Sequence, residues 1–101
     1  MTSALLAQNN AAIVGQLLNE ENKAIEFANV AVLGTGLGTY TDSLGNYKLS
    51  VPSDTKLKVI FSHLNHESQS FEVTLNAGET KRIDRVLTLK ENIITEAIVA
   101  D

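Results

Sequence analysis

Cysteine is absent from the 101-residue sequence, which excludes disulfide bonds and thiolate metal sites. Long apolar runs are absent too, since none approaches the roughly 18 residues that a membrane-spanning helix needs. Basic residues are few, and eight Lys and Arg against twelve Asp and Glu give a formal net charge of -4. The scattered placement of these basic residues argues against nucleic acid as a partner.

The remaining composition is that of one ordinary globular domain. Hydrophobic residues make up 44% of the chain and charged residues 20%, which excludes a largely disordered protein. A chain of this length buries roughly 65% of the surface that its unfolded form exposes. The sequence therefore predicts a single domain that folds without covalent cross-links.

A glycine-rich stretch over residues 34–47, GTGLGTYTDSLGNY, provides the main signal about fold. Its glycines and threonines alternate bends with extended segments. Gly45 lies where a hairpin loop over residues 42–46 needs a positive φ angle. Similarly, Asn65 is expected to take left-handed geometry in a later turn.

Apolar residues alternate with period two from residue 12 onward, which is typical of β-strands. Strands are expected near residues 13–17, 28–34, 39–41, 47–51, 57–63, 71–75 and 81–89. The phase over residues 81–89 is irregular, which a bulge or an edge position would explain. Residues 93–100 form a last extended run. The spacing predicts an all-β, seven-stranded β-sandwich of two sheets.

Four candidate chemistries are weak. His63 and His66 stand three apart, and residues three apart in a strand point to opposite faces, so a structural role beside a turn is favoured over a metal site. The Asp42 carboxylate is expected to accept backbone hydrogen bonds in its own turn rather than bind calcium, because the loop lacks further alternating carboxylates. Neither a phosphate loop nor a nucleophile is indicated, so no catalytic residue and no cofactor are predicted. Tyr40 is the best exposed aromatic residue for ligand contact.

Several segments together resemble the carboxypeptidase-regulatory-like domain. The resemblance rests on Ile-Val-Gly at residues 13–15, on Ala-Asn-Val-Ala-Val at 28–32, and on Gly-Thr-Tyr-Thr-Asp-Ser-Leu-Gly-Asn-Tyr-Lys-Leu at 38–49. The last segment matches the pattern G-T-x-T-D-x-x-G-x-[FY]-x-L throughout. One departure is His-Leu-Asn-His at 63–66, where the family commonly has an aromatic residue and Gly-Tyr.

The resemblance implies a transthyretin-like (prealbumin-like) Greek-key sandwich without catalytic activity. Such domains occur beside metallocarboxypeptidase domains and at the N-terminus of TonB-dependent outer-membrane receptors. Related sandwiches include starch-binding-like modules and adhesin repeats with Lys-Asn isopeptide bonds, which stay as alternatives.

Three segments are expected along the chain. Residues 1–10 include a short apolar run that is similar to the end of a signal peptide, with an artificial start as the alternative. Residues 11–90 form the sandwich. Residues 91–101 form an extended C-terminal segment at a domain boundary.

The resulting hypothesis is a non-enzymatic docking domain on the periplasmic face of the outer membrane, with secretion as the alternative location. Its partner is its own parent receptor chain or another periplasmic or outer-membrane protein. Contact is expected at the last strand, through Ile94, Ile98 and Val99, and this strand could also pair two copies as a dimer. A carbohydrate-binding module that uses Tyr40, and a regulatory domain beside a metallocarboxypeptidase, are the alternative functions.

Overall fold

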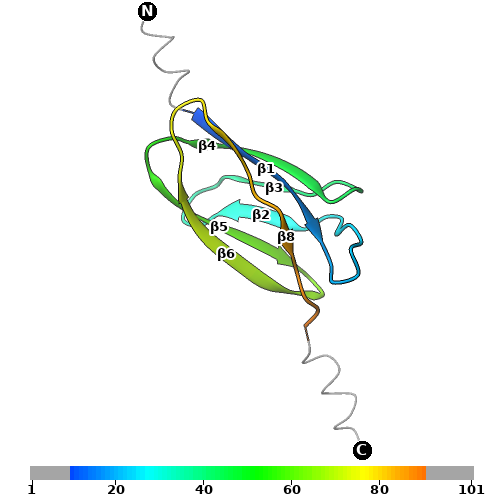
Figure 1. Ribbon diagram of the computed structural model, residues 1–101. Helices are drawn as coiled ribbons and strands as arrows, with labels where there is room; N and C mark the ends of the chain where they lie inside the picture. Colours follow the sequence, from blue (N-terminus) through cyan, green and yellow to red (C-terminus); the bar gives the residue numbers. More distant parts are fainter. Residues whose placement is uncertain (1–9, 91–101) are drawn as a thin grey trace, which may run out of the picture.

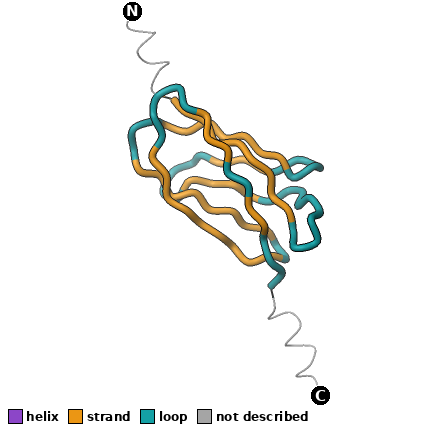
Figure 2. Tube along the Cα trace, viewed as in Figure 1, coloured by secondary structure: helices purple, strands orange, loops and turns teal. Residues whose placement is uncertain are grey.

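The computed structural model describes residues 10–90, and every regular element in this range is a β-strand. Two four-stranded sheets face each other across the core (Figures 1 and 2). The strands are β1 Asn10–Leu18, β2 Asn29–Val32, β3 Gly38–Tyr40, β4 Asn46–Pro52, β5 Lys56–His63, β6 His66–Thr74, β7 Thr80–Arg82 and β8 Arg85–Val86. The predicted all-β sandwich is confirmed. It has eight strands rather than seven, because residues 81–89 were expected to form one strand and contribute to two.

Strand β1 is the centre of the first sheet, which has the order β4-β1-β7 with β8 also paired to β1. It runs antiparallel to β4 and parallel to β7 and β8. The two parallel strands lie at the edge of this sheet, and the chain leaves the ladder between them at Ile83 and Asp84. The edge position that the irregular apolar phase predicted is therefore confirmed.

The second sheet has the order β3-β2-β5-β6 and is antiparallel throughout. The chain passes repeatedly from one sheet to the other: β1 and β4 lie in the first sheet, β2, β3, β5 and β6 in the second, and β7 and β8 return to the first. These long connections between sheets are typical of the predicted Greek-key class. The two ends of the described chain lie at opposite ends of the sandwich (Figure 1).

A two-residue turn of Leu64 and Asn65 joins β5 to β6. The expectation of a left-handed Asn65 is wrong. The non-glycine residues with positive φ in the described range are Asn22, Phe27 and Asp54. A register shift between Phe61 and His63 adjusts the ladder just before the turn, so the hairpin closes without a left-handed asparagine.

The core lies between the sheets and follows the period-two alternation of the strands. Its buried hydrophobic residues are Ala11, Ile13, Leu17, Ile25, Ala28, Val30, Val32, Tyr47, Leu49, Val51, Leu57, Val59, Phe61, Leu75, Ile83 and Leu87. The Tyr47 ring meets Phe61 edge-on, with ring centroids 5.5 Å apart. Phe71 and Val73 on β6 are only half-buried, because β6 is an edge strand that the opposite sheet covers incompletely.

Candidate functional site

Exposed hydrophobic side chains gather at one place on the second sheet. Phe27 is 72% exposed, Tyr40 63% and Leu64 86%, and all three line a hollow of about 370 Å³. Lys90, the last described residue, also lines it. We call this surface the Tyr40 hollow. Apolar side chains with this exposure are costly to leave in water, and a cluster of them is typical of a binding surface.

Polar side chains form the floor of the Tyr40 hollow. Asn29 on β2 lies directly opposite Tyr40 on β3 and directly opposite Ser62 on β5, so the three residues form a row across three strands. Ser68 of β6 also lines the hollow. The hollow thus combines flat apolar surfaces with amide and hydroxyl groups, which suits binding of an amphipathic partner or ligand.

A buried threonine holds Phe27 in its exposed position. The Thr41 hydroxyl donates to the Ile25 carbonyl at 2.6 Å and accepts from the Ala28 N–H at 2.9 Å. The Phe27 N–H donates to the Thr41 carbonyl at 3.1 Å. Phe27 itself has a φ of 62°, and such left-handed geometry is rare for a bulky residue. These bonds over-determine the loop and offset that strain.

The only carboxylate of the 42–46 turn accepts hydrogen bonds from the backbone of that same turn. Asp42 Oδ1 accepts the N–H groups of Leu44 and Asn46, both at 2.9 Å. Gly45 has a φ of 80°, which confirms the expected positive angle. The prediction that Asp42 accepts backbone hydrogen bonds in its own turn is confirmed.

The two histidines face each other across the β5–β6 turn. His63 and His66 are register partners, and their Nδ1 atoms lie 3.0 Å apart. His66 is only 7% exposed. Burial lowers the pKa of His66, the charge of His63 lowers it further, and the charge of Glu20 opposes both. The turn reverses the chain, so the two rings face each other, although residues three apart in one strand point to opposite faces.

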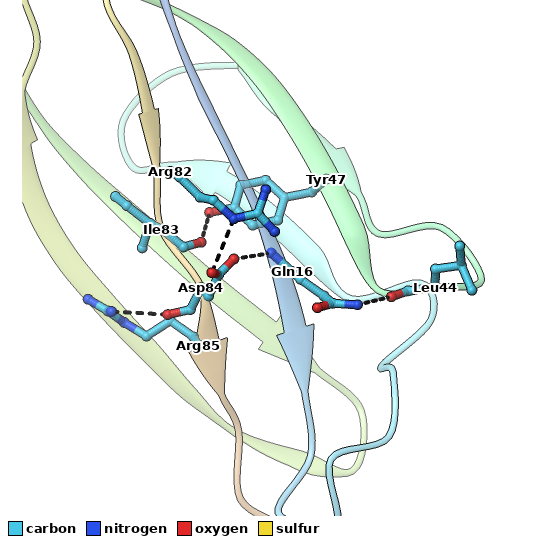
Figure 3. A network of polar contacts seen from close by, with 7 residues as sticks. All are labelled: Gln16, Leu44, Tyr47, Arg82, Ile83, Asp84 and Arg85. Atoms are coloured by element: carbon cyan, nitrogen blue, oxygen red, sulfur yellow. Dashed lines mark hydrogen bonds and ion pairs between the residues drawn. The ribbon is translucent and has the colours of Figure 1, made fainter.

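A polar network closes the gap between β7 and β8 (Figure 3). The Asp84 carboxylate accepts the Gln16 backbone N–H at 2.8 Å and the Arg82 Nε–H at 3.2 Å. The Tyr47 hydroxyl donates to the Ile83 carbonyl at 2.6 Å. Burial raises the pKa of Tyr47 to about 12, and the charge of Asp84 adds to the shift. Because these bonds join strands to one another, the network serves the fold.

Of the four site residues predicted from the sequence, only Tyr40 lies in the described part of the chain. Tyr40 lies in the hollow, as a ligand contact requires, while its contact with a ligand stays a prediction. Ile94, Ile98 and Val99 lie outside the described residues, so their contact with a partner and their dimer pairing also stay predictions. Sequence reasoning missed Phe27 and Leu64, whose only signal is a bulky apolar residue inside a polar loop.

Residues 10–90 contain no group of three or more His, Asp and Glu side chains that could hold a metal ion. They also contain no helix that is long and apolar enough to cross a membrane.

Comparisons with known proteins agree with this architecture. The sequence model of the CarboxypepD_reg-like domain matches residues 13–99. No curated protein matches the sequence. A chain of a type II cohesin–X-dockerin complex from Acetivibrio cellulolyticus superimposes with a TM-score of 0.68 at 13% identity, over 80% of this chain and 59% of that one. The Bacillus anthracis TIE protein superimposes with a TM-score of 0.66 at 14% identity, over 80% of this chain and 17% of that one. At these identities the likeness establishes a shared fold alone, and this chain spans less than two thirds of each neighbour.

Proposed function

This chain belongs to the CarboxypepD_reg-like domain family, and from that membership we propose that it is a non-catalytic docking domain. Its setting in this proposal is the periplasmic N-terminal extension of a TonB-dependent outer-membrane receptor. The partner is the rest of its own receptor chain or another periplasmic or outer-membrane protein. The receptor setting rests on the resemblance of the sequence to such extensions, and the docking role rests on the surface described above.

The observation that carries the docking role is the clustering of Phe27, Tyr40 and Leu64 at one hollow, next to Lys90. Covering these side chains removes a large apolar area from water at roughly 25 cal/mol per Å². Aromatic anchors of this kind dominate the binding energy of many protein interfaces. The chain beyond Lys90 contains Ile94, Ile98 and Val99, the residues predicted to contact a partner.

Structural relatives support a role in protein contact. One neighbour is part of a cohesin–X-dockerin complex, and a second structure of such a complex superimposes with a TM-score of 0.55. The fold is therefore compatible with modules that work inside protein assemblies.

Photo-crosslinking in intact source cells tests the proposal with a matched pair of leucines. A photoreactive residue at Leu64 in the hollow is expected to form a crosslink that fractionates with the outer membrane and has a mass several times 10.9 kDa. The same residue at Leu44, which is 64% exposed but lies in the 42–46 turn, is expected to form none. Equal crosslinking at both positions, or a soluble product near 10.9 kDa, would contradict the proposal.

Carbohydrate binding is the second candidate, and the row of Tyr40, Asn29 and Ser62 favours it. Sugar rings stack on aromatic faces while their hydroxyl groups bond to amides and hydroxyls. On this reading Tyr40→Ala abolishes glycan binding, and glycans shift the NMR signals of residues 36–47. The absence of any shift in a glycan screen would remove this candidate. A regulatory role beside a metallocarboxypeptidase predicts instead a crosslinked product with carboxypeptidase activity.

A further inference from the structure

The β5–β6 hairpin brings together the only two histidines of the chain. His63 ends β5 and His66 begins β6, and a two-residue turn separates them. Their Nδ1 atoms are 3.0 Å apart and their ring centroids 4.9 Å. The same nitrogen of both rings thus takes part in one contact, with a single proton between them when both rings are neutral. His63 Nδ1 also accepts the Asn65 backbone N–H at 3.3 Å, a long hydrogen bond that an ion on this nitrogen would displace.

We propose that His63 and His66 form a binding site for a divalent ion of the copper or nickel type, with both Nδ1 atoms as ligands. Two nitrogens bound about 2.1 Å from one metal at a right angle lie about 3.0 Å apart. A tetrahedral ion such as zinc would require about 3.4 Å. The observed 3.0 Å matches the right-angled arrangement of tetragonal Cu²⁺ and Ni²⁺ sites, and affinity for nitrogen ligands is highest for Cu²⁺ among these ions.

The surrounding backbone holds the pair in place before any ion binds. His66 is bridged to Leu89, and the Glu67 N–H donates to the Thr88 carbonyl at 2.7 Å. The start of β6 is therefore fixed against the chain that follows β8. Because the rings are already positioned, binding costs little conformational entropy. His63 lines the Tyr40 hollow and is only half-buried, which leaves an open path for the ion and for water as its other ligands.

When a metal ion binds Nδ1 of a neutral histidine, the single ring proton must be on Nε2. In His66 this Nε2 atom is buried and has no hydrogen-bond partner among residues 10–90. Binding through His66 Nδ1 therefore leaves the Nε2 proton without an acceptor among residues 10–90, and this cost lowers the affinity for the ion.

Titration of the whole chain with CuCl₂, followed by calorimetry and electron paramagnetic resonance, tests the proposal. The expected result is one Cu²⁺ per chain with a spectrum that shows nitrogen ligands, and weaker binding of Ni²⁺ and Zn²⁺. His63→Ala should weaken Cu²⁺ binding about tenfold or more. Glu72→Gln is the control, because it changes only an exposed pair with Lys56 and should leave binding unchanged.

A readout on the unmodified protein avoids the risk that a variant fails to fold. Paramagnetic Cu²⁺ should broaden the NMR signals of residues 62–67 before those of the 42–46 turn, which holds the Asp42 carboxylate. Absence of binding, broadening that begins elsewhere, or affinity unchanged by His63→Ala would overturn the proposal and leave only an imidazole–imidazole hydrogen bond. Tighter binding of Zn²⁺ than of Cu²⁺ would overturn the assigned geometry.

Discussion

The replacement Gly15→Ala should destabilise the fold severely, because β1, β4 and the connection between β7 and β8 meet at this glycine. Gly15 on β1 is the register partner of Tyr47 on β4. A Cβ atom built at Gly15 would overlap the Ile83 carbonyl oxygen and would lie 2.7 Å from the Ile83 carbonyl carbon and 2.9 Å from Tyr47 Cε2. Ordinary contacts of this kind exceed about 3.4 Å. The backbone at Ile83 must therefore move away from β1.

That movement breaks identifiable interactions. The Ile83 N–H donates to the Val14 carbonyl at 2.8 Å, and the Ile83 carbonyl accepts from the Tyr47 hydroxyl at 2.6 Å. Two hydrogen bonds contribute about 1 kcal/mol each, and partial exposure of the buried Ile83 side chain adds about 1 kcal/mol. The expected loss is about 3 kcal/mol, out of a total stability of about 5–15 kcal/mol for a domain. This loss corresponds to a fall in Tm of about 12–24 °C.

Urea denaturation followed by circular dichroism measures this loss, with Gly36→Ala as the matched control. Gly36 has no heavy atom within 4 Å of its added Cβ and no positive φ. Alanine there should leave stability unchanged or raise it by up to about 1 kcal/mol, since it restricts the unfolded chain. If Gly15→Ala unfolds within about 1 kcal/mol of the control, then β1 and the β7–β8 connection are not packed as described, and the reasoning fails.

Two further substitutions test single hydroxyl groups. Tyr47→Phe should cost about 1–2 kcal/mol at neutral pH, because the Ile83 carbonyl loses its donor. The raised pKa of Tyr47, about 12 against an ordinary 10.0, means that the fold favours the neutral phenol. The free energy of unfolding of the wild-type chain should therefore fall as pH rises from about 10 through 12. The Tyr47→Phe variant should not show this fall. Identical pH dependence of stability in the two proteins would refute the argument. Thr41→Val should lower the stability measured in a thermal melt by about 1–3 kcal/mol, because it leaves the Ile25 carbonyl and the Ala28 N–H unpaired. Thr41→Ser keeps the hydroxyl and should lower stability far less. Equal losses in the two variants would show that the hydroxyl is not needed.

Local pattern was sufficient to predict most of the sandwich. The alternation of Tyr47, Leu49 and Val51 with polar neighbours depends only on strand geometry, and Gly45 depends only on the turn that it completes. The division between β7 and β8 could not be read in this way. There the Asp84 side chain replaces a backbone carbonyl as acceptor for the N–H of Gln16, a residue 68 positions earlier in the chain.

The candidate site was harder to predict for the same reason. Tyr40 could be found because its phase points out of the core. The exposure of Phe27 depends on hydrogen bonds to Thr41, which follows it by 14 positions. His63 and His66 were predicted to lie on opposite faces because residues three apart in one continuous strand do so. The turn instead reverses the chain and makes them partners in adjacent strands.

The polar residues of the family motif stabilise the fold, so the motif carries little information about ligands. Thr41 fixes the loop before β2, Asp42 closes its own turn, and Tyr47 reaches under β1 to the Ile83 carbonyl. The hydroxyl groups of Thr41 and Tyr47 bond within the domain, and Asp42 Oδ1 bonds within its own turn, so these groups stabilise the fold. Tyr40 differs, because it fills the unspecified position of the G-T-x-T-D pattern and points to solvent. Recognition by this chain must therefore depend on positions that the motif leaves open, and those positions are where substitutions should change binding without unfolding the sandwich.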